Sequence, residues 1–274
     1  MTRILIIGAT SLIAEHTARL WGAKDVEFVL VAKDAKKLAS VAADLEVRTG
    51  AKTEQIIMDF TSPKEVKATM ARVFKQPVHT ALIAQGVLTR QHDAKETSVI
   101  FGSVAINASS PAMFAESIAN GFEAQGFGRC GIIGSVAGER GRGDLYVYGA
   151  SKAFLETFVE GLNNRFNSKK IRFMIIKPGP VATPMVSPGT QRAAITAKPE
   201  TVASAAAVAS PLVAVVTSPV EAGDAGKLSV LALIAALSAL TAATSADTEA
   251  PAGAPRRAKA SPVMAGAVAP FQSV

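Results

Sequence analysis

The chain has 274 residues, of which 49% are apolar and 19% are charged, so it can bury a large core, and this composition argues against global disorder. Its net charge of +7 favours a phosphate-bearing partner, but scattered basic residues and an aromatic content of 5% argue against a nucleic-acid interface. The single cysteine precludes an internal disulfide and fits the cytoplasm, and three widely spaced histidines predict no metal site.

Strand-like and helix-like segments alternate from residue 1 to about 204. The apolar run at 3–7 superficially looks like a signal peptide, but it leads directly into a glycine turn and a helix, as a buried strand does. Six strands are expected at 3–7, 27–32, 55–58, 80–84, 129–134 and 171–176. Helices are expected at 13–21, 35–49, 63–74, 103–123, 148–167 and 200–209, with a bend or break at Pro111. The alternation predicts an α/β fold, a single Rossmann-type doubly wound parallel sheet with helices on both faces.

The composition changes near Ala205, where alanine becomes abundant. We therefore predict one folded domain over 1–220, with a seventh strand at 212–217, and a tail over 221–274 that is partly helical or disordered. The uncharged run at 228–246 is long enough to cross a bilayer, but its Ala, Ser and Thr content favours a packed helix at least equally. Peripheral association with a membrane therefore stays open. The tail also fits a reading-frame change in the parent gene, which mass spectrometry of native protein ending at Val274 would refute.

The first strand runs into a glycine turn with the sequence GATSLIA at 8–14. A glycine lets the backbone bend sharply, and the N-terminus of the following helix offers N–H groups to a pyrophosphate. Such a turn is by itself a weak signal, because short motifs match by chance and a lone glycine is often structural. The residues expected at this phosphate site are Gly8, Thr10, Ser11, Leu12 and Ile13.

A stronger pattern is Ser135 followed by Tyr148 and Lys152. A tyrosine and a lysine four residues apart share one helix face, and an ammonium beside a phenol lowers the phenol pKa toward the range of a general acid/base. The Ser135 hydroxyl, at the end of a strand, can hold a substrate oxygen. Tyr146 has no lysine at that spacing because residue 150 is alanine, and a surface Tyr–Lys pair is the structural alternative.

Together these patterns resemble the short-chain dehydrogenase/reductase family over residues 1 to about 204. The resemblance implies an oxidoreductase that transfers hydride between NAD or NADP and a carbonyl or secondary alcohol, with Ser135, Tyr148 and Lys152 as the acid/base set. Asn107 matches the helix asparagine of the family's proton relay. The other residues implied to contact the cofactor are Lys33, Asp59, Phe60, Ala84, Gln85, Gly86, Tyr148, Lys152, Pro178, Gly179, Val181 and Thr183.

Two positions depart from the family pattern. The middle glycine of the turn is Leu12, whose side chain would crowd the pyrophosphate, and the usual asparagine before Ala-Gly is lost at Ala84–Gln85. Either change would weaken cofactor binding. Lys33 stands where family members that prefer NADP often carry arginine, so NADP is slightly favoured over NAD. Asp34 follows it, and a solvated Lys–Asp loop is the alternative.

Within the family, residues 8–14, 135–140 and 146–149 look most like the keto-sugar reductase half of the decaprenylphosphoryl-ribose 2′-epimerase system. This similarity implies a keto-sugar or lipid-linked sugar as the substrate. Arg140 and Arg142 would then meet a phosphodiester, although ordinary loop charges are the favoured alternative.

A non-catalytic dinucleotide-binding sensor or scaffold is the alternative from another functional class, favoured only by Leu12 and the tail. An epimerase or dehydratase of the longer related family is disfavoured by the spacing of the glycine turn. The expected partners are a small carbonyl or alcohol substrate and further copies of the chain, in a dimer or tetramer that pairs through the helices at 103–123 and 148–167. Residues 184–201 are expected to form a lid over the substrate.

Overall fold

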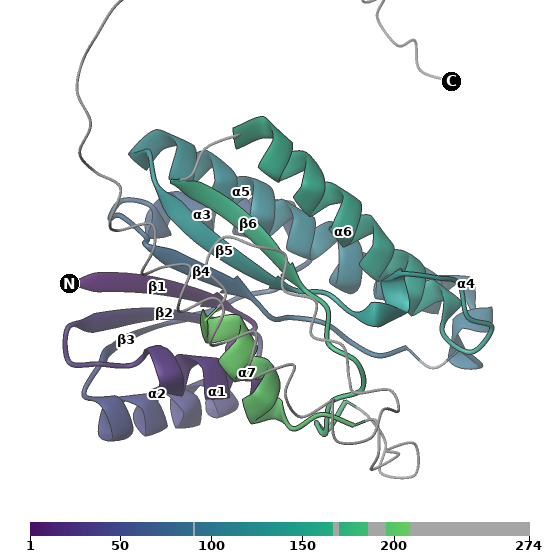
Figure 1. Cartoon of the computed structure of the whole chain (residues 1–274), viewed down its shortest axis with the longest axis horizontal. Helices are drawn as coiled ribbons and strands as arrows, with labels where there is room; N and C mark the ends of the chain where they lie inside the picture. The colour runs from purple at the N-terminus through teal and green to yellow at the C-terminus, as the bar shows by residue number, and fades with distance from the viewer. Residues whose placement is uncertain (90, 167–169, 186–195, 209–274) are drawn as a thin grey trace, which may run out of the picture. The chain divides into compact units, whose positions relative to one another are not determined.

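A parallel sheet forms the centre of the protein in the computed structural model, which describes residues 1–89, 91–166, 170–185 and 196–208 (Figure 1). The described strands are β1 (Thr2–Ile7), β2 (Val26–Ala32), β3 (Lys52–Ile57), β4 (Thr80–Ile83), β5 (Gly128–Ile133) and β6 (Ile171–Ile176). Every pairing is parallel, and the order across the sheet is β3-β2-β1-β4-β5-β6. The predicted doubly wound sheet is confirmed, with each strand within three residues of its expected start.

Helices cover both faces of this sheet. The α-helices are α1 (Leu12–Trp21), α2 (Ala35–Thr49), α3 (Pro63–Val73), α4 (Thr97–Val104), α5 (Ser110–Gln125), α6 (Tyr146–Phe166) and α7 (Pro199–Val208). Three short turns of helix are η1 (Asp93–Lys95), the π-helical η2 (Ala105–Ser109) and η3 (Val136–Gly138). Side chains of α1, α2 and α7 share one apolar cluster, and those of α3, α5 and α6 share the other. The sheet is therefore the middle layer of three.

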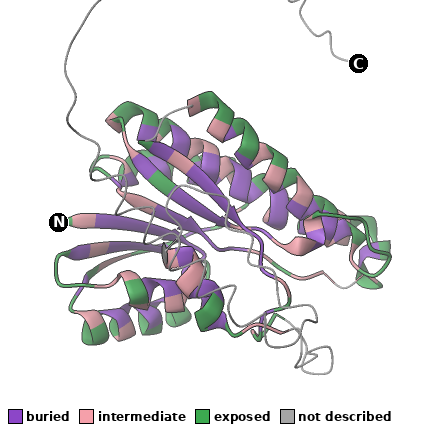
Figure 2. Cartoon of the chain, in the orientation of Figure 1, coloured by how far each residue is buried: buried purple, intermediate pink, exposed green. Residues whose placement is uncertain are grey.

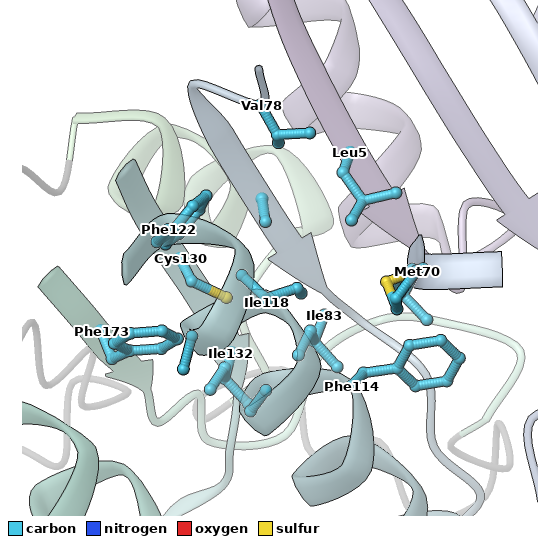
Figure 3. Packing of buried hydrophobic residues seen from close by; sticks show 14 of the residues in the cluster. Leu5, Met70, Val78, Ile83, Phe114, Ile118, Phe122, Cys130, Ile132 and Phe173 are labelled. Atoms are coloured by element: carbon cyan, nitrogen blue, oxygen red, sulfur yellow. The ribbon is translucent and has the colours of Figure 1, made fainter. Parts of the chain in front are cut away.

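The alternation of side chains along the strands supplies both apolar layers, and buried residues run along the strands and the inner helix faces (Figure 2). In β1, Leu5 joins the cluster beneath α3, α5 and α6, whereas its neighbour Ile6 joins the cluster beneath α1 and α2. Figure 3 shows the first of these layers, where Leu5 and Ile83 of the strands lie with Phe114 and Phe122 of α5. Burial on both faces explains why the central strands are continuous apolar runs.

Local signals fix the ends of the helices. The Asp34 carboxylate accepts a hydrogen bond from the Lys37 N–H at 3.0 Å and begins α2, and Ser62 caps α3 in the same way. Gly50 ends α2 with φ of 70°, a left-handed conformation that favours glycine. These caps mark where α2 and α3 begin and where α2 ends.

The helix predicted at 103–123 is longer, because a helical run extends from Thr97 to Gln125. Pro111 neither breaks nor ends it. Instead, the run contains the π-helical turn η2 just before α5, with Pro111 in the first turn of α5. The reason is chemical: an α-helix would pair the carbonyl of Asn107 with the N–H of residue 111, and proline has no N–H. The wider turn accommodates this missing donor.

The run Thr97–Gln125 is also apolar enough to cross a membrane, with a mean hydropathy of 1.3. Its side chains Phe114, Ile118 and Phe122 are fully buried in the core beneath the sheet. The α5 part of the run is therefore packed in the core, whereas Phe101 in its α4 part is exposed. Several predicted features lie outside the described residues: the seventh strand, the uncharged run at 228–246, the tail at 221–274 and most of the expected lid. The helix α7 begins at Pro199, within the range predicted for that lid.

Candidate active site

The switch point of the sheet lies between β1 and β4. The chain passes from β1 outward to β2 and β3, and then crosses to β4 on the other side of β1. In a doubly wound sheet, ligands bind in the crevice at the carboxyl ends of the strands where this reversal occurs. The glycine turn after β1 and the Ala84–Gln85–Gly86 segment after β4 both lie there.

Gly8 is required at this point for two reasons. Its φ is 79°, and a Cβ placed on it would lie 2.6 Å from the backbone nitrogen of Gln85. The close approach joins the turn after β1 to the end of β4. Ser11 precedes α1 and makes no side-chain capping hydrogen bond, while the side chains of Ile13 and Ala14 are buried in the core. The N–H groups at the start of α1 are therefore not capped by the Ser11 side chain.

Ser135, Tyr148 and Lys152 come together as the sequence predicts. Ser135 directly follows the segment after β5, and its hydroxyl shares a hydrogen bond with the Tyr148 hydroxyl and accepts another from the Ala137 N–H at 3.1 Å. The Lys152 Nζ lies 5.7 Å from the centroid of the Tyr148 ring and donates to the carbonyl oxygen of Ile133 at 3.0 Å. Tyr146 is half-exposed at the start of α6.

Two glycines let the serine segment lie directly on the backbone of α6. A Cβ at Gly138 would be 2.8 Å from the Ala153 nitrogen, and one at Gly149 would be 2.5 Å from the Ala137 carbonyl oxygen. Larger residues at either position would separate η3 from the helix that carries Tyr148. The contact between Ser135 and Tyr148 therefore depends on small residues on both sides.

Burial governs the two titrating groups of this set. Burial raises the pKa of the Tyr148 phenol above its ordinary value, and the hydrogen bond with Ser135 opposes this in part. Burial also lowers the pKa of the Lys152 ammonium to about 8. The pKa of the phenol is therefore raised rather than lowered as expected, because the loss of hydration is the largest contribution.

Asn107 lies in the π-helical turn η2 and is completely buried. Its side-chain amide pairs with the backbone of Val87, accepting from the N–H and donating to the carbonyl, both at 2.9 Å. A Cβ at Gly86 would lie 3.1 Å from the Asn107 Oδ1 and 3.6 Å from the Lys152 Nζ. Asn107 thus fixes the loop after β4 close to Lys152, with only a glycine between them.

Asp59 and Phe60 lie after β3, toward the outer part of the crevice. The Asp59 carboxylate accepts two hydrogen bonds from Thr61, and these, with a smaller contribution from the charge of Lys33, lower its pKa. The structure thus places Lys33 on the same side of the sheet as Asp59, both exposed. The Phe60 ring packs edge-on against Phe114 of α5 at 5.8 Å.

A buried polar relay behind this region was not predicted from the sequence. The Gln85 Nε2 donates to the Ser110 Oγ, and the Ser110 hydroxyl donates to the carbonyl oxygen of Phe60 at 2.6 Å. Gln85, at the place where the usual asparagine of the family is lost, therefore joins the segment after β4 to α5 and to the loop after β3. The residues are too far apart in sequence for a local pattern to reveal the contact, and only the departure at Gln85 marked it.

The segment after β6 lies beside the serine segment. The Val136 N–H donates to the Pro178 carbonyl at 3.2 Å, so the ladder of β5 and β6 continues past Ser135. Val181 forms a parallel bridge with Ala197, which brings together the two ends of the segment that leads to α7. Thr183 is partly exposed at this bridge. Arg140 and Arg142 are exposed, and the structure brings neither onto Ser135 by any contact among the described residues.

Comparisons with known proteins agree with this geometry. The family model described as short chain dehydrogenase matches residues 2–194. The chain is 30% identical over 207 residues to the "uncharacterized oxidoreductase in mprA 5'region" of Streptomyces coelicolor, covering 74% of this chain and 80% of that protein. It is 28% identical over 188 residues to the chloroplastic "NADPH-dependent aldehyde reductase-like protein" of Arabidopsis thaliana, with coverages of 65% and 70%. A short-chain dehydrogenase from Sphingobium yanoikuyae, solved in complex with NADPH, matches with a TM-score of 0.69 at 22% identity over 93% of this chain and 99% of that one.

The fold and the switch-point crevice define a Rossmann-type α/β oxidoreductase. The match over most of the described residues shows its family: the chain belongs to the short-chain dehydrogenases. This confirms the resemblance on which the site residues were chosen. The finer similarity to the keto-sugar reductases stays a prediction.

Proposed function

We propose that this protein is an NADP(H)- or NAD(H)-dependent reductase of carbonyl compounds, or a dehydrogenase of the matching alcohols, with Ser135, Tyr148 and Lys152 as its catalytic residues. The observation that carries the proposal is the contact between the three, in which Lys152 is buried and Ser135 and Tyr148 are partly buried. The phenol of Tyr148 shares a hydrogen bond with Ser135, and the Lys152 ammonium lies 5.7 Å from the phenol ring. A surface Tyr–Lys pair would have neither the burial nor the serine partner.

The residues at the switch point fit a dinucleotide. The uncapped N-terminus of α1 offers N–H groups to a pyrophosphate, and Gly8 brings that turn against the end of β4. Gly86 leaves room beside Lys152, where any side chain would approach Asn107. We assign the binding of the cofactor to Gly8, Thr10, Ser11, Leu12, Ile13, Lys33, Asp59, Phe60, Ala84, Gln85, Gly86, Tyr148, Lys152, Pro178, Gly179, Val181 and Thr183.

When bound, the nicotinamide supplies or accepts the hydride. The side chains of this protein handle the substrate oxygen and its proton. Ser135 donates a hydrogen bond to that oxygen, and Tyr148 gives it a proton in the reductive direction. Lys152 provides positive charge next to the phenol and holds the nicotinamide ribose, and Asn107 positions a water that connects Lys152 to solvent. The raised pKa of Tyr148 keeps this group protonated at neutral pH, as an acid must be.

NADP is the cofactor we favour, because Lys33 is exposed near Asp59 and is free to meet a 2′-phosphate. The Arabidopsis relative is named as NADPH-dependent, which agrees with this choice. Titration of the protein with NADPH and NADH, followed by nicotinamide fluorescence, tests it. Lys33→Asp is expected to weaken NADPH binding about tenfold and to leave NADH within about threefold. Lys36→Asp, the same charge change in the first turn of α2, is the control, and equal losses in both variants would contradict the assignment.

For the substrate, we propose a keto-sugar or a lipid-linked keto-sugar among the carbonyl compounds. The support is the exposed pair Arg140 and Arg142, which follow the serine segment and offer two guanidinium groups to a phosphate. The test is a comparison of turnover with cyclohexanone, 4-nitrobenzaldehyde, a keto-pentose and its phosphodiester. A preference for the phosphodiester that disappears in Arg140→Ala/Arg142→Ala supports the proposal, and equal turnover of all four compounds contradicts it.

We also propose that the chain works in the cytoplasm as a homo-oligomer, a dimer or tetramer, paired through α4, α5 and α6. Phe101 of α4 is 78% exposed and Phe154 of α6 is 50% exposed, which is unusual for large apolar side chains. Light scattering during size-exclusion chromatography measures the mass directly. Phe101→Glu/Phe154→Glu is expected to give monomers, and an unchanged mass would place the contact elsewhere.

A further inference from the structure

Lys177 carries a charge in a largely buried position next to the proposed site. It lies between the end of β6 and Pro178–Gly179, and its side chain is only 10% exposed. Its Nζ lies 2.6 Å from a carboxylate oxygen of Glu156 and 3.2 Å from one of Glu139. An ammonium buried to this degree requires such partners, because burial without them would be costly. The hydrogen bond with Glu156 raises the pKa of Lys177, so the ammonium stays charged across the neutral range.

The three members of this ion cluster come from the three segments that carry the proposed chemistry. Glu139 ends the short helix η3, which begins directly after Ser135. Glu156 lies one turn beyond Lys152 on α6, because the two are four residues apart. Lys177 itself directly precedes Pro178 and Gly179, which the family resemblance implies to contact the cofactor. A single side chain therefore connects the serine segment, the catalytic helix and the Pro178–Gly179 segment.

Among the described residues, backbone hydrogen bonds join only two of these three segments. The β5–β6 ladder continues through the Gly134 and Val136 N–H groups to Ile176 and Pro178, so it joins the serine segment to the end of β6. That ladder does not reach α6. On the α6 side, Lys152 donates a hydrogen bond to the Ile133 carbonyl ahead of Ser135, whereas η3 itself meets the helix through close packing at Gly138 and Gly149. The Lys177 ammonium supplies directional bonds to both sides at once.

We propose that Lys177 is a positioning residue, which keeps Ser135 in register with Tyr148 by holding η3 and α6 together through Glu139 and Glu156. The inference rests on the proposed function of Ser135 and Tyr148. Its physical basis is that the bonds of the ammonium to Glu139 and Glu156 fix geometry, while the partial exposure of both carboxylates limits the cost of losing Lys177. A misplacement of about 1 Å at a catalytic group can cost about a hundredfold in rate. Lys177 therefore affects turnover more than stability.

The chain offers a matched control on the same helix. Arg165 of α6 also bridges two carboxylates, those of Glu116 and Glu123, but at the other end of α6 and between α5 and α6. Arg165→Met removes the same kind of cluster without touching the serine segment. Lys177→Met leaves Glu156 and Glu139 partly exposed to water, at 26% and 47%, so the variant is expected to fold. Lys177→Arg restores a cation that can reach both carboxylates.

The first readout does not depend on turnover. The chain has two tyrosines, so in a Tyr146→Phe background the near-ultraviolet ionisation signal reports Tyr148 alone. The hydrogen bond with Ser135 lowers the pKa of Tyr148, so its loss moves the ionisation to higher pH. Lys177→Met is expected to produce that shift, Lys177→Arg to reverse it, and Arg165→Met to leave the midpoint unchanged. An unchanged midpoint in Lys177→Met would overturn the proposal.

The second readout is turnover of 4-nitrobenzaldehyde with NADPH. Lys177→Met is expected to lower kcat about tenfold to a hundredfold with an unchanged dissociation constant for NADPH, whereas Arg165→Met changes neither. If both Met variants had equally lowered melting temperatures and full kcat, the role of Lys177 would be merely structural, and this result would overturn the proposal. If wild-type protein does not turn over the probe, the proposed function fails in that assay, and the Tyr148 titration still decides the role of Lys177.

Discussion

At the scale of single residues, burial changes the pKa values of two side chains in the site, raising that of Tyr148 and lowering that of Lys152. The phenol of Tyr148 is hard to ionise because water is removed from it, and the ammonium of Lys152 is easy to deprotonate for the same reason. In both groups burial favours the neutral form. The spacing in the sequence identified Ser135, Tyr148 and Lys152. It did not predict that the pKa of the Tyr148 phenol is raised, because burial depends on the assembled core.

Lys152 should therefore lower the stability of the folded protein. Its pKa is about 8 when folded against an ordinary value of 10.5, so the unfolded chain binds more protons between these values and stability rises with pH through this window. Below about pH 8 the burial of the charged Lys152 lowers the free energy of unfolding by its full amount, at most about 3 kcal/mol. Lys152→Met is expected to raise the melting temperature at pH 7 while abolishing turnover, and the gain should shrink as the pH approaches 10.5. Thermal unfolding at several pH values measures this, and a variant less stable than wild type at pH 7 would contradict it.

At the scale of elements, the site depends on glycines that allow two backbones to meet. Gly8 → Ala is expected to destabilise the fold through its φ of 79° and through contact with the Gln85 nitrogen. Gly126, with φ of 83° and open space around it, is the control for the conformational cost alone, which is about 1–2 kcal/mol. Denaturant unfolding should show a larger loss for Gly8→Ala than for Gly126→Ala. Equal losses would mean that the β1 turn relaxes away from β4.

The sequence predicted elements well where burial is two-sided and less well elsewhere. The starts of β1 and β2 are right within one residue because these strands are continuous apolar runs. β3 begins three residues before its expected start at Gln55, because the early residues of this edge strand are not fully buried and show no pattern. Pro111 was expected to bend or break a helix, whereas in the structure a π-helical turn precedes it and the helical run continues. The contact of Asn107, within this turn, with Val87 is distant in sequence and has no local pattern that predicts it.

At the scale of the whole molecule, the described core is contained in the first part of the chain. Its two apolar clusters draw on residues from Ile4 to Ala206, and the ion cluster of Lys177 lies within the same range. The polar relay at Gln85 and the cluster at Lys177 were not predicted, because both join segments far apart in sequence. The family, the doubly wound parallel sheet and the meeting of Ser135, Tyr148 and Lys152 were predicted, because each rests on short patterns placed on successive elements.

The predicted domain boundary gives a test at this scale. A chain that ends after Val220 keeps every residue of the described core, so it is expected to unfold at a denaturant midpoint close to that of the full chain and to bind NADPH with similar affinity. Circular dichroism and nicotinamide fluorescence measure the two properties. A shortened chain that fails to fold would show that 221–274 belongs to the folded domain.

The most direct test of the central claim, that Tyr148 is the acid/base of this oxidoreductase, compares Tyr148→Phe with Tyr146→Phe. Tyr146 lies two residues earlier on α6 and is half-exposed, so its variant controls for the loss of a hydroxyl from this helix. Steady-state turnover of 4-nitrobenzaldehyde with NADPH is the measurement, together with the NADPH dissociation constant. We predict that Tyr148→Phe loses about a hundredfold or more in kcat with NADPH affinity retained, and that Tyr146→Phe keeps both. Full turnover in Tyr148→Phe would contradict the account.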